Sequence, residues 1–159
     1  MANICYGKIN VLVPTKNKEE FLNLFYGTDK DGNYVGAEID DFRDELEYID
    51  LPNGITYIKG NISCRWSFES SSLNRDGYSD EKFLTFKEAF EKYDVEALNI
   101  SAEEPGVGFI ETISYDRESD ELYHEVYDYV DMNAKEWWYE DYISEVESKS
   151  KKTDGGMER

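Results

Sequence analysis

The sequence predicts a single α+β domain in which an antiparallel sheet packs against helices, and two kinds of pattern predict it. Runs at residues 5–13, 55–68 and 95–102 alternate apolar and polar side chains, as half-buried strands do. Other stretches combine a capping-box spacing with apolar residues at helical intervals. The 159 residues are the length of one domain, and a 40% apolar content is sufficient for a core.

The first half of the chain is expected to form a strand, a helix and a second strand. After the strand at 5–13, Asn17 and Glu20 have the spacing of a capping box and begin a helix. Residues 27–54 are an acidic, turn-rich insertion, in which a short helical turn is expected before Pro52-Asn53-Gly54. The strand at 55–68 follows.

The second half is expected to add a helix, three strands and a closing helix. Thr85 and Glu88 begin the second helix, and the turn Glu104-Pro105-Gly106 links the strand at 95–102 to the next. A further strand covers 122–130, and the last helix runs from Asn133 to about Ser148.

These elements give one domain over residues 1–148, with the acidic insertion at 27–54 and a C-terminal extension at 116–148. Residues 149–159 are expected to be a disordered tail. The side chains expected in the core are Phe21, Leu24, Cys64, Trp66, Phe86, Phe90 and Phe109.

Three motifs resemble one known family. They are Met1-Ala2-Asn3 before the first strand, Trp66-Ser67 near the end of the long strand, and the run EEPGVGF at 103–109. Together they resemble the YubB-type (Api-like) domain family of phage, plasmid and mobile-element proteins, over roughly residues 1–115. The resemblance implies a ferredoxin-like antiparallel sheet with two packed helices, to which the acidic insertion and a C-terminal strand and helix are added. It implies no catalytic residue, and Phe68-Glu69-Ser70-Ser71 stands where the family has prolines.

The net charge limits the kinds of partner that the protein is expected to bind. Asp and Glu number 36 against 17 Lys and Arg, which gives −19 and a pI near 4.3. Such a surface repels nucleic acid phosphates and anionic membranes, so we expect direct binding to neither. A basic protein or nucleoprotein is the expected partner. No long apolar run or signal-peptide pattern is present, so we expect a cytoplasmic location, in the cytosol of the host cell.

Motifs for catalysis, metal binding or cofactor binding are weak. The single histidine, His124, shares a strand face with Leu122 and is expected to pack there. Cys5 and Cys64 lack metal-site spacing and are expected to be reduced. The run from Asp29 resembles a calcium loop but lacks its glycine, and the run PGVGF is no phosphate loop. We therefore expect no enzyme, no catalytic residue, no metal and no cofactor.

Acidic residues are concentrated near the C-terminus. Residues 116–147 contain twelve carboxylates against two basic residues, Arg117 and Lys135. On the last helix, Trp138 and Tyr139 are expected on the buried side, and acidic residues and Trp137 occupy the opposite side. Acids combined with aromatic rings suit docking into a basic groove. The expected partner-binding residues are Glu121, Glu125, Asp128, Asp131, Glu136, Trp137, Glu140 and Asp141, with Asp40, Asp41, Asp44 and Glu45 in the insertion.

The expected function is inhibition of a host nucleic-acid-binding defence complex, as an anti-CRISPR or anti-restriction protein, by nucleic acid mimicry or steric occlusion. One alternative is a non-inhibitory phage or plasmid adaptor, compatible with a homodimer through a sheet edge, whose acidity serves solubility only. Another is a small hydrolase or nuclease that uses metal-bound carboxylates. The sequence leaves open which acidic segment dominates binding.

Overall fold

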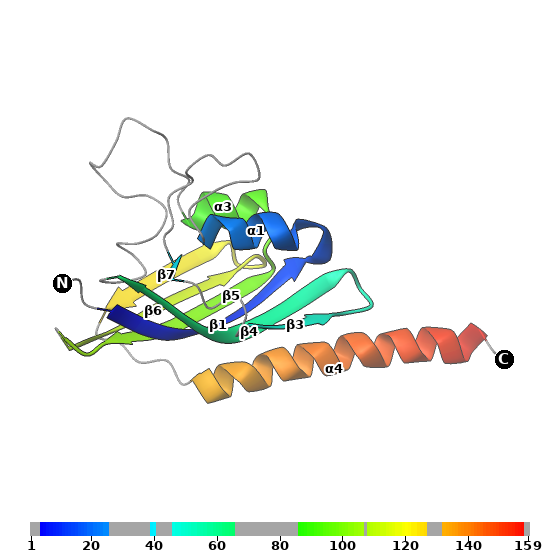
Figure 1. Cartoon of the computed structure of the whole chain (residues 1–159). Coiled ribbons are helices and arrows are strands. Elements are labelled where there is room, and N and C mark those ends of the chain that lie inside the picture. Colours follow the sequence, from blue (N-terminus) through cyan, green and yellow to red (C-terminus); the bar gives the residue numbers. More distant parts are fainter. Residues whose placement is uncertain are drawn as a thin grey trace.

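A computed structural model of the chain describes residues 4–25, 39–40, 46–65, 86–106, 108–126 and 132–157 (Figure 1). The strands are β1 (Ile4–Pro14), β2 (Ile39–Asp40), β3 (Glu47–Asp50), β4 (Ile55–Arg65), β5 (Ala97–Glu104), β6 (Phe109–Asp116) and β7 (Glu121–Val126). The helices are α1 (Lys18–Phe25), α3 (Phe86–Lys92) and α4 (Met132–Met157), and a 3-10 turn at Thr15–Asn17 leads into α1. The protein is therefore a mixed α/β structure.

The described strands form one antiparallel sheet with β1 near its centre. The order across it is β2-β4-β1-β5-β6-β7, and β3 also pairs with β4. Because β2 pairs with β4 at Ser63 and Cys64 whereas β3 pairs with it at 56–59, β2 and β3 share one edge of β4. The sheet is thus six strands wide, with β7 at the edge opposite β2.

Helices cover both faces of the sheet. Figure 1 shows α1 and α3 side by side on one face and α4 running along the other, past the end of the sheet. The alternation of each strand supplies one apolar layer to α1 and α3. Val11 pairs with Ile58 on one side and Leu98 on the other, and all three are buried.

The core under α1 and α3 confirms most of the predicted apolar pattern that falls within described residues. Phe21 of α1 and Phe90 of α3 are fully buried, with ring centroids 6.3 Å apart. Phe90 also packs against Tyr115 of β6 at 5.1 Å. Phe109 is half-buried against this cluster. The predicted core side chains of Leu24, Cys64, Trp66 and Phe86 lie outside the part of the structure in which side chains are described.

A close contact between β1 and β5 explains why residue 7 is a glycine. A Cβ atom on Gly7 would lie 2.8 Å from the Cβ of Ala102, its partner in the ladder, and equally close to the carbonyl oxygen of Ser101. The two strands can approach in this way because Gly7 has no side chain.

Two element predictions need correction, those for residues 47–50 and for the end of the last helix. Residues 47–50, which we expected near a helical turn, form β3, because they extend the hydrogen-bonded ladder of β4. Helix α4 continues to Met157 instead of ending near Ser148, through residues that we expected to be disordered. The predicted start of the first helix is confirmed, because α1 begins at Lys18, directly after Asn17. The Asn17 side chain also donates to the carbonyl oxygen of Tyr93 at 2.9 Å, so it ties α1 to the end of α3.

Candidate functional site

Helix α4 is attached to the sheet through Tyr139, whose side chain is fully buried. Its ring stacks on Tyr57 of β4, with centroids 5.3 Å apart and planes 17° apart. Leu12 and Ala97 complete the apolar contact, and Tyr142 and Ile143 pack at its margin. This contact fixes which side of α4 faces solvent.

A chain of hydrogen bonds accompanies that contact. The Tyr139 hydroxyl donates to Oδ1 of Asn99 at 2.7 Å and lies 3.3 Å from the carbonyl oxygen of Asn10. The Asn99 amide donates to Oγ of Ser114 at 2.8 Å, and the Tyr57 hydroxyl donates to Oδ1 of Asn10. These bonds link α4 to strands β4, β1, β5 and β6, so the position of the helix is specified by polar as well as apolar contacts.

The solvent side of α4 carries the predicted acidic residues. Trp137 is 67% exposed, and Glu140 and Asp141 are exposed, as we predicted, whereas Glu136 is half-buried. Trp138 was predicted on the buried side but is 49% exposed. It packs edge-on against Tyr139 at 4.9 Å and stacks on Tyr142 at 6.2 Å.

One acidic residue of the sheet, Glu47 of β3, lies near the contact between α4 and Tyr57. Burial raises the pKa of Tyr57, and the negative charges of Glu136, Glu140 and Glu47 raise it further. Glu47 of β3 was not among the predicted binding residues, and it also pairs with Lys59 at 3.6 Å. The alternation in Glu47–Asp50 would have placed Glu47 on this face if the segment had been assigned as a strand.

A groove lies between α4 and strands β5 to β7. Its volume is about 410 Å³, and Glu121 and Glu125 of β7 line it together with Lys135 and Trp138 of α4. The structure therefore brings two predicted acids of β7 beside the helix that carries Glu136, Trp137, Glu140 and Asp141. We call the resulting surface the acidic face. It consists of Glu121 and Glu125 of β7, Glu136, Trp137, Glu140 and Asp141 of α4, and Glu47 of β3.

The predicted residues of the insertion do not join the acidic face within the described structure. Asp40 lies in β2, at the edge of the sheet opposite β7. The remaining predicted residues, Asp41, Asp44, Glu45, Asp128 and Asp131, lie outside the described residues.

His124 has a more polar environment than we expected. It shares its face with Leu122, as predicted, but its ring nitrogen Nε2 lies 2.7 Å from Oε1 of the fully buried Glu111. Nearby on the same face, Glu104 is buried and accepts a hydrogen bond from the backbone of Gly106 at 2.7 Å. One imidazole–carboxylate pair supplies a proton donor and acceptor but defines no reaction.

Within the described ranges, no three His, Cys, Asp or Glu side chains gather as a metal site would require. Among those residues, no helix has both the length and the apolar character needed to cross a bilayer.

Comparisons with protein-family models, with curated proteins and with solved structures find no match for the chain. The functional conclusion therefore depends on the motifs, the fold and the acidic face.

Proposed function

We propose that this chain is an acidic mobile-element protein that binds a host nucleic-acid-binding defence complex and inhibits it. The binding surface is the acidic face, which occupies the DNA or RNA channel of an anti-CRISPR or anti-restriction target in the cytosol. The observation that carries the proposal is the combination, on one side of α4, of exposed Glu140 and Asp141 with the largely exposed ring of Trp137.

The spacing of the carboxylates supports mimicry of a nucleic acid. Glu136 and Glu140, and likewise Asp141 and Glu145, are four residues apart on α4 and so ~6 Å apart along the helix axis. One strand of a nucleic acid likewise presents negative charges in a regular row along its axis. Lysine and arginine side chains that bind phosphates can pair with carboxylates arranged in this way.

The ring of Trp137 supplies a contact that lengthens the lifetime of the complex, which charge alone does little to extend. Exposed carboxylates steer a basic partner toward the surface but contribute little to the lifetime of the complex. A tryptophan buried on binding slows dissociation, because its large ring leaves water only in the complex. Trp137 is placed among the acids of α4 to act in this way.

The connectivity supports a ferredoxin-like core, as the family resemblance implied. Along the chain, α1 follows β1, and α3 connects β4 to β5. Across the sheet, the edge strands β2 and β3 are followed by β4, β1 and β5, all antiparallel. This order is the one expected for the split β-α-β arrangement of ferredoxin-like domains, and it supports the proposal of such a core. Strands β6 and β7 and helix α4 are then additions to that core, and they carry most of the acidic face.

A phage-plating assay tests the proposal. Bacteria that carry defined CRISPR or restriction systems are challenged with phage while they express the wild-type chain, and plating efficiency is measured. We expect the wild type to restore plating against at least one system that depends on nucleic acid binding. Failure against every such system, with soluble folded protein in the cells, would refute the proposal.

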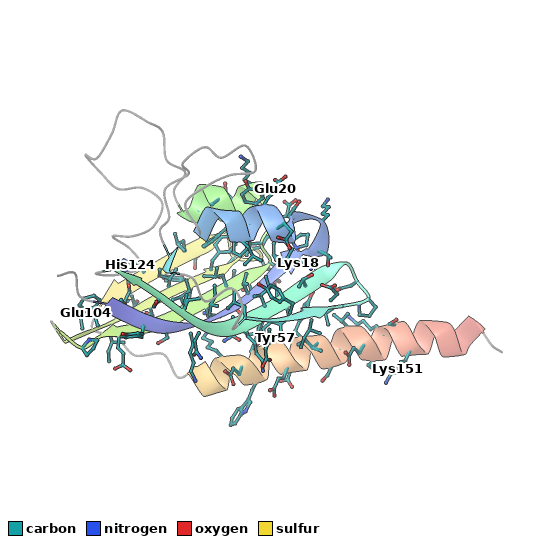
Figure 2. The ribbon with its side chains drawn as sticks, in the orientation of Figure 1. Lys18, Glu20, Tyr57, Glu104, His124 and Lys151 are labelled. Carbon is teal, nitrogen blue, oxygen red and sulfur yellow. The ribbon has the colours of Figure 1, made fainter. Side chains whose placement is uncertain are left out.

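A matched pair of variants tests whether the acidic face is the surface that inhibits the target. Glu140→Lys/Asp141→Lys should abolish the restored plating. The control Glu20→Lys/Glu91→Lys changes the net charge equally but lies on α1 and α3, on the opposite face of the sheet (Figure 2 labels Glu20). It should retain inhibition. Equal loss in both variants would show that inhibition depends on the total charge of the protein and not on the acidic face.

A further inference from the structure

The groove beside α4 is lined by two aromatic side chains that are about half exposed to solvent. Trp138 of α4 and Tyr123 of β7 both line it, and they are 49% and 53% exposed. Tyr142 stacks on the ring of Trp138 and so holds that ring in one orientation. Part of the Trp138 ring still faces the groove. Exposed aromatic rings that line a concavity are typical of a contact surface for a ligand.

The charge of the groove selects the sign of that ligand. Asp116, Glu121 and Glu125 line it, and Lys135 is the one basic side chain among the residues that line it in the described structure. The excess of carboxylates repels phosphates and attracts a cation. A cation held beside aromatic rings gains a further attraction to their π faces.

The polar groups of the groove distinguish a guanidinium from an ammonium group. The Tyr123 hydroxyl donates to the Glu121 carboxylate, which orients that acceptor at the rim. The hydroxyl of Ser114 accepts a hydrogen bond from Asn99 at 2.8 Å and lines the floor with Thr112. Oriented oxygen acceptors beside flat rings suit arginine, which is planar, has five donors and stacks on aromatic faces. The compact, strongly hydrated ammonium of lysine uses such a site less well.

We propose that this groove binds an arginine side chain of the basic partner protein. This proposal rests on the proposed function, because it names the group by which the inhibited complex is recognised. The arginine would otherwise contact nucleic acid phosphate in its own protein. The groove and the outer side of α4 then engage the partner together, the groove through one arginine and the outer side through charge and Trp137.

Lys135 has a defined role in this arrangement. It lies on α4 and lines the groove, so its positive charge would compete with a cationic ligand for the carboxylates of β7. Replacing it with glutamine should therefore strengthen the binding of an arginine peptide, whereas a structural role of Lys135 would predict no gain.

Peptide titration tests the proposal without knowledge of the partner. Acetyl-Gly-Arg-Gly-amide is titrated into the full chain, and the indole N–H signals of Trp138 and Trp137 are followed by NMR, assigned with Trp→Phe variants. We expect the Trp138 signal to shift and the Trp137 signal to stay. The citrulline peptide, which has the same shape without the charge, should leave both unchanged, and the lysine peptide should bind more weakly. No shift at Trp138, or an equal shift with citrulline, would overturn the proposal.

Substitutions in the groove test which side chains contribute to binding of the arginine peptide. Trp138→Leu and Glu121→Gln/Glu125→Gln should each weaken arginine-peptide binding about tenfold, and Lys135→Gln should strengthen it. Trp137→Leu, on the outer side of α4, is the matched control and should bind the peptide as the wild type does. Urea unfolding of each variant shows whether the fold is retained. Tyr123→Thr, at an exposed strand position, replaces Trp138→Leu if that variant unfolds.

The same variants separate this proposal from the function on which it rests. If Glu140→Lys/Asp141→Lys abolishes inhibition in the plating assay while folded Trp138→Leu inhibits as the wild type does, the arginine groove is refuted and the function stands. If the wild type inhibits no system, the function fails, and the arginine groove as a partner contact fails with it, whatever the peptide titration shows. Loss of inhibition in the groove variants, together with weakened peptide binding, supports both.

Discussion

At the scale of single residues, the acidic face depends on one tyrosine. Tyr139 is fully buried, stacks on Tyr57 and donates to Asn99. Helical spacing in the sequence places Tyr139 on the buried side of its helix, but it does not reveal its polar partners. Asn10 and Asn99 lie on strands far away in the sequence, and their meeting depends on the sheet order.

Removing the Tyr139 hydroxyl should destabilise the protein. Tyr139→Phe keeps the ring but leaves the buried Asn99 oxygen without this donor, which should cost about 1–3 kcal/mol in the free energy of unfolding. Urea unfolding at neutral pH measures the change. Tyr142→Phe is the control, because its hydroxyl accepts an exposed hydrogen bond from Asn53 at 2.9 Å, and we expect it to cost less than about 1 kcal/mol. Equal stability of Tyr139→Phe and the wild type would contradict the network.

The same tyrosine predicts the response to alkaline pH. Burial raises the pKa of Tyr139 well above its ordinary value, and the neighbouring Tyr57 raises it further. The folded state therefore favours the neutral hydroxyl, and this contribution is complete below pH ~10, where unfolded tyrosines are also neutral. Above that pH the contribution is lost, by at most about 1.4 kcal/mol per pH unit, until the pH passes the raised pKa.

Urea unfolding between neutral pH and strongly alkaline pH checks this dependence. Tyr139→Phe should start from a lower stability at neutral pH and then lose stability less steeply above pH ~10 than the wild type. Parallel curves for the two proteins would show that Tyr139 does not contribute to the alkaline transition.

At the scale of elements, α4 contacts the sheet over a short stretch. It spans 26 residues, or ~39 Å, yet among its described side chains the apolar contact with the sheet is made by Tyr139, Tyr142 and Ile143. This explains why the amphipathic pattern was correct for these residues and wrong for Trp138, which lies beside the contact and faces the groove. It also explains why the pattern did not predict the end of the helix, since its later turns extend past the sheet (Figure 1).

Shortening α4 should therefore test whether the stability of the protein depends on the length of the helix or on its contact with the sheet. A chain that ends at Ser148 retains every contact of Tyr139, Tyr142 and Ile143, so its midpoint of urea unfolding should match that of the full chain. Its helical circular dichroism signal should fall. Tyr139→Ala, which keeps the length but removes the contact, should instead cost about 3–5 kcal/mol, as for other large buried aromatic residues. A large loss of stability on shortening would show that the later turns of α4 carry a contact of their own.

At the scale of the whole molecule, the sequence predicted the acidic character and most of the apolar core but not the distribution of the charge. Alternation and capping patterns located β1, β4, β5 and α3 because each is a long, regular signal. Strands β2 and β3, which each pair with the same edge of β4, were missed because they are short and acidic. The groove could not be predicted, because it forms where α4 passes β5 to β7 and depends on tertiary packing.

The central claim, that the acidic face competes with nucleic acid for a basic protein, is tested most directly by displacement. A defence complex whose inhibition the plating assay reveals is bound to fluorescent DNA, and release of the DNA by added protein is measured by anisotropy at low and high salt. We expect the wild type to release the DNA, less effectively at high salt. Glu140→Lys/Asp141→Lys should be at least about tenfold weaker, and Glu20→Lys/Glu91→Lys should stay within about twofold of the wild type. Stable binding of the wild type to the complex with the DNA still in place would contradict the account.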